Sequence, residues 1–266
     1  MKWVKKIFKR SKIVSVIRLD GVIGSAGQFG SGLEDSTLSP VLEKAFEMSR
    51  VQAVALIINS PGGSPTQSSL ISSRIRRLAK EKKLPVFAFC EDVAASGGYW
   101  LACAADEIFA DENSIIGSIG VISASFGFHE LISRQGIERR IYTAGEEKSM
   151  LDPFRPEQKE DVVRLKAIQQ AIHKNFKRHV ESSRGEKVKD KPIFTGEVWD
   201  SLRAKNLGLI DGIGHLEPIL MERYGENVEF KHVRKKKGFL SRLSKSSINS
   251  VIQFFINRVY FSRFNL

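Results

Sequence analysis

A lone serine stands where almost no side chain would crowd it. Residues 92–100 read DVAASGGYW, which places Ser96 between two alanines and two glycines, after the apolar run LPVFAFC of residues 84–90. Such a run predicts a strand that is buried on both faces. At its end Ser96 could cap the following helix, because a serine oxygen accepts a backbone N–H. It could equally be a nucleophile, since open α/β sheets place their sites at the carboxyl ends of parallel strands.

A glycine-rich turn after another apolar run could serve the same chemistry. Residues 58–64 read INSPGGS and end the run AVALIIN of residues 53–59. A tight turn alone explains most PGG triplets, although adjacent glycines also let a substrate approach the backbone closely. In the functional interpretation, the N–H of Gly62 or Gly63 acts with that of Gly97 to hold an oxyanion, which requires preorganised donors.

A serine hydroxyl is a weak nucleophile until a base takes its proton. Among the five histidines, His129 alone lies near the expected active edge of the sheet. The other four lie on a predicted helix or late in the chain, where structural or solvated histidines are the usual case: His173, His179, His215 and His232. No aspartate in a strand-end loop flanks any of them, so the histidines do not by themselves indicate a triad.

The elements that must position these residues follow an α/β pattern. Apolar runs and one-sided apolar stripes alternate along the chain, which predicts right-handed parallel βαβ units. We expect strands at residues 13–19, 53–59, 84–90, 107–110, 119–125 and 139–143. We expect helices at residues 40–50, 67–82 and 99–106, a long one from Pro156 to before Gly185, and a short one within residues 195–214.

Composition predicts one main core with two basic tails. The chain has 266 residues, 42% of them hydrophobic, which is enough for a single sizeable core. Residues 1–12 and 231–266 carry fifteen lysines and arginines and no acid, so the tails account for the whole net charge of +12. We therefore divide the chain into a basic segment at residues 1–12, a compact domain at residues 13–225, and a basic linker with an amphipathic helix at residues 226–266.

Neither targeting nor disulfide chemistry is indicated by the sequence. No run approaches the roughly 20 apolar residues of a membrane-spanning helix, and the N-terminal region lacks the pattern of a cleavable signal peptide. Cys90 and Cys103 both lie in apolar elements, where free cysteine acts as a small buried hydrophobe. This fits a reducing compartment.

Five motifs together resemble a known protease family. INSPGG and DVAASGGYW are followed by IIGSIGVI at residues 115–122, by a Gly-x-x-Lys within AGEEKSMLDPF at residues 144–154, and by TGEVWDSLRAKNLGLIDGIG at residues 195–214. In this order, over about residues 13–220, they resemble the serine–lysine signal peptide peptidases of the SppA and SohB type, peptidase family S49. That resemblance implies the ClpP/crotonase-like layered α/β fold.

The resemblance also implies a role for each matched residue. Ser96 is then the nucleophile, Lys148 the general base, and Ser118 the hydroxyl that positions the lysine, while Gly63 and Gly97 donate to the oxyanion. A lysine acts as a base near neutral pH only if its neutral form is populated, which burial favours. The carboxylates at positions 146 and 147 would favour the charged form, so they must point elsewhere.

The implied function is a serine endopeptidase for short hydrophobic peptides, such as cleaved signal peptides. It requires no metal and no organic cofactor. Family members assemble into rings, and in some the serine and lysine of one site come from adjacent subunits, so the resemblance implies a homo-oligomer.

Two other functions remain open. The same fold supports a Ser–His–Asp triad, as in ClpP, or an acyl-CoA pocket, as in crotonases. A ClpP-like chain should carry a histidine shortly after the nucleophile's helix, where this chain reads GSIGVISAS. The other possibility is a catalytically silent scaffold whose basic tails bind nucleic acid or a membrane complex.

The tails favour a membrane surface over nucleic acid. In residues 1–12, Trp3, Val4, Ile7 and Phe8 fall on one side of a helix with cations around the other, which is the composition of an interfacial helix. A second apolar stripe occupies residues 248–259, and it could instead contact a neighbouring subunit. Neither tail carries a known nucleic-acid motif. We therefore expect a peripheral protein on an anionic membrane surface, on the cytoplasmic side.

Overall fold

The computed structural model describes residues 11–24, 32–145, 147–234, 261–262 and 264. Two compact units divide the chain: the first comprises residues 1–119 and 177–266, and the second residues 120–176. Most of the two tails predicted to bind a membrane, residues 1–12 and 231–266, lies outside the described residues, namely residues 1–10, 235–260, 263 and 265–266.

The first unit is built on one sheet. Its strands are β1 (Ile13–Asp20), β2 (Val51–Ser60), β3 (Val86–Ala95), β4 (Glu107–Ala110), β5 (Ile115–Gly117), β6 (Val198–Trp199), β7 (Gly212–Ile213) and β8 (Glu229–His232). They run in the order β6-β5-β3-β2-β1-β8, with β4 pairing β3 and β7. Every pairing is parallel except that of β5 with β6. The predicted α/β fold of βαβ units is confirmed.

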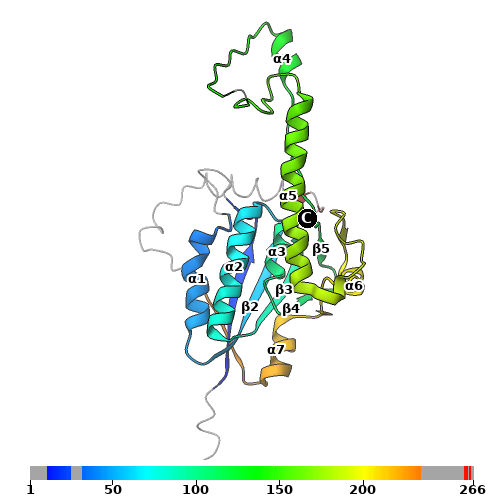
Figure 1. Ribbon diagram of the computed structural model, residues 1–266. Helices are drawn as coiled ribbons and strands as arrows, with labels where there is room; N and C mark the ends of the chain where they lie inside the picture. Colours follow the sequence, from blue (N-terminus) through cyan, green and yellow to red (C-terminus); the bar gives the residue numbers. More distant parts are fainter. Residues whose placement is uncertain (1–10, 25–31, 146, 235–260, 263, 265–266) are drawn as a thin grey trace, which may run out of the picture. The chain divides into compact units, whose positions relative to one another are not determined.

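Helices cover one face of this sheet (Figure 1). They are α1 (Asp35–Glu47), α2 (Pro65–Lys82) and α3 (Gly97–Ala102). Successive residues of a strand point to opposite faces, so Leu56 and Ile58 can meet the helices while Ala55 faces away. All three are fully buried, which fits the nearly continuous apolar runs of a parallel strand.

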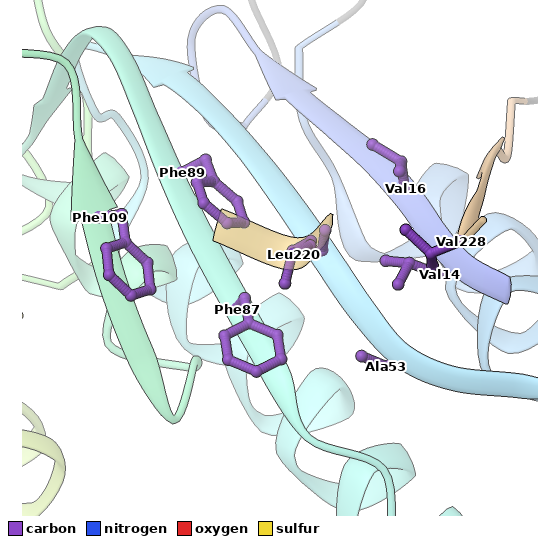
Figure 2. Close-up of a cluster of buried hydrophobic side chains, with 9 residues drawn as sticks. Val14, Val16, Ala53, Phe87, Phe89, Phe109, Leu220 and Val228 are labelled. Atoms are coloured by element: carbon purple, nitrogen blue, oxygen red, sulfur yellow. The ribbon is translucent and has the colours of Figure 1, made fainter. Parts of the chain in front are cut away.

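The opposite face carries a second apolar cluster. Val14, Val16, Ala53, Ala55, Phe87, Phe89, Phe109, Leu220 and Val228 are buried together there. Figure 2 shows Leu220 of α7 (Leu216–Tyr224) lying over the side chains that project from the central strands. The rings of Phe89 and Phe109 stack with their centroids 5.5 Å apart. Apolar side chains are therefore buried on both faces of the sheet.

A buried ion pair between Arg184 and Asp211 lies beside β4. The guanidinium of Arg184, at the end of α5 (Lys159–Arg184), donates two hydrogen bonds to Asp211, at 2.8 and 3.0 Å, and one to the carbonyl of Gly208. Asp211 also accepts from the N–H of Ile108 at the start of β4. Hydrogen bonds from Arg184, Lys187 and Ile108 lower the pKa of Asp211 to about 2, against the opposing effect of its burial.

The second unit contains α4 (His129–Arg134) and the first part of α5. Two predicted strands, at residues 119–125 and 139–143, are wrong: both stretches are irregular. Strand β5 instead covers residues 115–117 and ends where Gly117 and Ser118 adopt positive φ.

The sheet also reaches further along the chain than the sequence indicated. Strand β8 pairs with β1 from Ile13 to Val16, although its residues were assigned to the C-terminal linker. The compact part therefore continues past residue 225, and the division into domains otherwise stays a prediction. The remaining short elements are a 3-10 helix, Gly185–Val188, and α6 (Ser201–Asn206).

Candidate active site

Ser96 occupies the helix N-cap position without acting as a cap. It directly precedes α3, but its side chain makes no capping hydrogen bond, and its backbone has φ 52° and ψ −121°. A residue with a Cβ adopts such dihedrals only where the surroundings impose them, and such residues cluster at functional sites. The cap interpretation of Ser96 is therefore not supported, and its half-buried hydroxyl lies at the carboxyl end of β3.

A bulge in β3 carries the chain to this point. Ile58 of β2 pairs with Cys90, but Ser60 pairs with Ala94, so β3 has two extra residues between these pairs. The side chain of Asn59 holds the bulge: it donates to Asp92 at 2.7 Å and accepts from the N–H of Val93 at 3.3 Å. Bulges re-aim side chains near active sites. This one extends β3 five residues past the predicted end at residue 90.

The diglycine turn lies against the serine. A Cβ built on Gly62 would be 2.8 Å from the nitrogen of Gly97 and 2.8 Å from the Cβ of Ser96. Gly62 has φ +102°, so glycine is required there both by conformation and by space. The turn predicted as part of an oxyanion site is therefore packed directly on the Ser96–Gly97 peptide.

Hydrogen bonds fix which way the glycine N–H groups point. The N–H of Gly62 donates to the hydroxyl of Ser60 at 3.2 Å, and the carbonyl of Gly62 accepts from the N–H of Ile23 at 2.8 Å. In a trans peptide the carbonyl and the following N–H point in opposite directions. The N–H of Gly63 therefore points away from Ile23, toward the β3 side of β2, and Gly63 is exposed.

Ser118 lies beside Ser96 at the ends of two paired strands. Ala95 of β3 is paired with Gly117 of β5, and the N–H of Ser96 donates to the carbonyl of Gly117 at 2.8 Å. Ser118 is 4% exposed and has φ 53°. The structure thus brings Ser96, Ser118 and the predicted glycines together within one unit.

Lys148 lies in the second unit, and the structure does not place it relative to Ser96. It is an exposed residue of a turn whose ends are tied to α5. Glu147 pairs with the guanidinium of Arg164, and the N–H of Leu151 donates to Asp161 at 3.0 Å. Glu147 is therefore directed to an arginine, and no ion pair joins it to Lys148 among the described residues.

Two of the histidines have partners away from Ser96. His179 stacks on Trp100 and donates from Nε2 to its carbonyl at 3.0 Å, and burial lowers the pKa of this imidazole. His215 pairs with Asp111 at 2.8 Å beside a cavity of about 560 Å³ whose lining does not include Ser96. His129 belongs to the second unit. The His215–Asp111 pair was missed in the sequence because 104 residues separate its members.

Asn59 and Ser60 belong to the site although the sequence motifs assign them no role. Asn59 and Ser60 precede the Pro-Gly-Gly of the turn, and such residues hydrogen-bond nearby backbone groups. That preference was the available signal. The sequence carries no such signal for Ile23, because its hydrogen bond to Gly62 joins residues that are distant in the chain. In the part of the chain that the structure describes, no group of three or more His, Cys, Asp or Glu residues could hold a metal ion.

Solved structures share this fold. Two alanine variants of a membrane-bound stomatin-specific protease match 85% and 92% of this chain and 100% and 98% of their own, with TM-scores of 0.50 and 0.51. Their sequence identities are 16% and 17%, so the likeness concerns the fold alone. The expected ClpP/crotonase-like class is confirmed.

The family is shown by sequence: a family model for peptidase family S49 matches residues 78–226, more than half of the chain. The chain belongs to peptidase family S49. The matched range contains Ser96, Gly97, Ser118 and Lys148, and the diglycine turn precedes it.

Individual relatives agree with this assignment. The chain is 30% identical to a putative signal peptide peptidase SppA of Enterococcus faecium over 79% of its own length and 62% of that protein's. It is 31% identical to the probable protease SohB of Haemophilus influenzae over 75% of its length and 56% of that protein's.

A further relative carries a different kind of name. The chain is 50% identical, over 86% of its length, to a Brucella abortus protein named Na(+)/H(+) antiporter NhaA, but it covers only 31% of that protein. Most of that longer protein thus lies outside the aligned stretch. The chain spans less than two thirds of the length of the first curated relatives that it matches. Among the described residues, no helix is long and apolar enough to cross a membrane.

Proposed function

We propose that this chain is a serine endopeptidase that uses Ser96 as its nucleophile and Lys148 as its general base. The observation that carries the proposal is the conformation of Ser96: a positive-φ serine at the carboxyl end of a parallel strand, whose hydroxyl does not cap the helix behind it. Strained backbone of this kind is retained where it positions a reacting group. Membership of peptidase family S49 supports the same reaction.

In the proposed acylation, the neutral amine of Lys148 takes the proton of the Ser96 hydroxyl while Oγ attacks a peptide carbonyl. The N–H groups of Gly63 and Gly97 hold the negative oxygen that forms. Gly62 is not a donor in this mechanism, because its own N–H is bound to Ser60. Its lack of a side chain lets the turn pack against Ser96 and Gly97. When the C–N bond breaks, the protonated lysine returns the proton to the leaving amine.

Water completes the cycle. It attacks the acyl ester on Ser96 with Lys148 again acting as base, which releases the carboxylate product and the free serine. In this mechanism Ser118 supplies the hydroxyl that positions the lysine. Its support is its place beside Ser96 at the paired ends of β3 and β5. No metal or organic cofactor is required by any of these steps.

The proposed substrates are short hydrophobic peptides, such as cleaved signal peptides. This proposal is supported by the family and by the name of the Enterococcus faecium relative, a putative signal peptide peptidase. For the stomatin-specific protease, one structure replaces a serine by alanine, and the other replaces a lysine by alanine and holds a substrate peptide.

We propose that the active form is a homo-oligomeric ring. The second unit exposes large apolar side chains that a monomer would leave in water: Tyr142 is 91% exposed, Phe126 79% and Ile122 72%. Exposed apolar side chains in this number are typical of protein contacts. Lys148 belongs to the same unit, so assembly could complete the dyad. Light scattering that finds an active monomer would refute the ring.

A peripheral membrane position is proposed from the basic tails. Each lysine or arginine near an anionic surface contributes about 1 kcal/mol, so the two tails together should hold the protein on such vesicles at low salt. Removal of residues 1–12 and 235–266 should release it in a co-sedimentation assay. Equal binding to neutral and anionic vesicles would contradict this proposal, as would tight binding to duplex DNA that persists at high salt.

Replacement of the nucleophile tests the central proposal. Ser96→Ala should lower peptide or ester hydrolysis by roughly 10⁴-fold or more, because loss of a nucleophile removes the whole acylation route. A fluorophosphonate should label the native chain and not this variant. Hydrolysis at the native rate by Ser96→Ala would overturn the proposal, and loss of activity on His129→Ala with Lys148→Ala unaffected would favour a histidine base.

A further inference from the structure

Ser60 is a buried residue that links the two glycine turns of the site. It ends β2, is fully buried, and is followed by Pro61 and Gly62. Its hydroxyl accepts the N–H of Gly62 at 3.2 Å. A serine that bonds the N–H two residues ahead closes a small turn in place of a backbone carbonyl.

This hydrogen bond sets the direction of the next peptide unit. With its N–H held by Ser60, Gly62 turns its carbonyl to the N–H of Ile23 at 2.8 Å, and the N–H of Gly63 consequently points the opposite way. Glycine has access to more backbone conformations than any other residue, so a Gly-Gly peptide without an anchor can rotate. Ile23 anchors the Gly62–Gly63 peptide itself, and Ser60 anchors the preceding Pro61–Gly62 peptide, so the two hydrogen bonds together fix the turn.

The same residue supports the start of α3. A Cβ built on Gly98 would lie 2.4 Å from the carbonyl oxygen of Ser60 and 3.2 Å from its Cβ. The first turn of α3, which carries the N–H of Gly97, therefore lies directly on Ser60. One buried residue thus contacts both segments whose N–H groups are proposed to hold the oxyanion.

We infer that Ser60 is a positioning residue for the oxyanion site. Together with Ile23, its hydroxyl keeps the Gly62–Gly63 peptide in the orientation that presents the Gly63 N–H on the Ser96 side. The inference rests on the proposed function, since it assigns Ser60 a part in that reaction. Gly62 is buried, so without the hydroxyl its N–H would have no water to turn to, and the turn would rearrange to satisfy it.

Ser60→Ala tests this inference by removing the acceptor alone. We expect kcat to fall about tenfold with KM unchanged, less than the roughly 10²–10³-fold cost of deleting an oxyanion donor. A peptide boronic acid forms an adduct with the serine that places an oxygen where the oxyanion forms. Its affinity should fall by the same factor as kcat, because both depend on the same donors.

Two further variants separate positioning from stability. Ser60→Thr keeps the hydroxyl acceptor and should restore most of kcat. Ser114→Ala is the matched control: Ser114 is also buried and donates to the carbonyl of Cys90, away from the glycine turns. It should lower the melting temperature without the selective loss of kcat and boronate affinity.

The outcomes distinguish this inference from the proposed function. Unchanged kcat and boronate affinity in Ser60→Ala, while Ser96→Ala is inactive, would overturn the role of Ser60 and leave the protease intact. The same would follow if Ser60→Ala and Ser114→Ala lost activity only in proportion to their melting temperatures. If Ser96→Ala remains active, the proposed function itself has failed.

Discussion

The serine and the lysine proposed for one reaction belong to two regions that are built in opposite ways. Around Ser96, strand ends, glycines and a short helix are buried and hydrogen-bonded to one another, and the reactive residue is held in a conformation it would not adopt alone. Around Lys148 the chain is irregular, polar contacts are made on an exposed surface, and large apolar side chains face water.

This difference separates two ways of building a site. The proposed nucleophile is preorganised by contacts within one unit, so its geometry is a property of the single chain. The proposed base lies on a segment whose apolar surface is unburied in the isolated chain. We infer that substitutions near Ser96 act on the chemistry directly, whereas those in the second unit, apart from Lys148 itself, act on it through assembly.

The lysine offers the largest test of the comparison. Lys148→Ala should lower kcat at neutral pH by about 10³-fold, the usual size of a general-base contribution. The chain should keep its circular dichroism and its melting temperature, because the side chain is exposed. Lys166→Ala, an exposed lysine on α5 of the same unit, serves as the control and should retain full activity. Equal losses in both variants would reject Lys148 as the base.

The diglycine turn should be nearly as sensitive. Gly62→Ala would place a Cβ 2.8 Å from the nitrogen of Gly97, so the turn must move away from Ser96. We expect a loss of kcat of about 10²-fold, similar to removal of an oxyanion donor. Gly225→Ala is a close match, since Gly225 has φ +98° but its Cβ would meet nothing within 4 Å.

Both glycine variants carry the strain of a positive φ, which costs about 1–2 kcal/mol. Only Gly62→Ala should also lose activity. The measurement compares the hydrolysis rates of Gly62→Ala and Gly225→Ala at a temperature where both variants are folded. Full activity in Gly62→Ala would show that the turn is not part of the chemistry.

The buried ion pair tests whether the first unit depends on its own interior. Arg184→Met should lower the free energy of unfolding by about 3–5 kcal/mol, because it leaves the Asp211 carboxylate with less compensation. The side chain of Arg184 is only 1% exposed. Denaturant titration measures the change. A loss below about 1 kcal/mol would mean that Lys187 and the N–H of Ile108 suffice for Asp211.

The pair also predicts how stability depends on pH. The pKa of Asp211 is about 2 in the folded chain, below the ordinary value of about 3.9. Its contribution is therefore complete once the pH is well above ~4, and it is lost as the pH falls through about 2, below which the carboxylate is protonated in both states. Arg184→Met should flatten this part of the stability profile, and an identical profile in both proteins would contradict the assignment.

The smallest effect on stability is expected at the exposed apolar surface. Tyr142→Ser should change the free energy of unfolding by less than about 0.5 kcal/mol, as is usual for exposed positions. Sedimentation should nevertheless show smaller assemblies, with activity falling in parallel. If this variant and Phe126→Ser both assemble like the native chain, these exposed side chains are not subunit contacts.

Much of the first unit could be predicted because its signals are local. The runs that became β1 and β2 are apolar and rich in β-branched residues, the run that became β3 is apolar and carries two phenylalanines, and the stripe on α2 has helical spacing. The extension of β3 to Ala95 could not be predicted, since it depends on Asn59 of another strand holding the bulge. The same holds for β8, whose four residues, EFKH, are too few to give a strand pattern and whose strand pairs with β1.

The second unit misled the prediction for a related reason. Residues 119–125 and 139–143 have the composition of strands, yet a strand also needs a neighbour to bond with. Gly117 and Ser118 turn the chain out of the sheet before the first of these stretches. For the site, local motifs predicted the serines and glycines that the fold brings together. The position of Lys148 depends on geometry between units, which no motif encodes.

The dihedral angles of Ser96 set stability against catalysis at one position. A left-handed conformation that a glycine would adopt freely costs a serine about 1–3 kcal/mol. Ser96→Gly therefore offers the chain a more stable fold at the loss of its hydroxyl. The hydroxyl of the proposed nucleophile is thus held in place at a measurable expense in folding free energy.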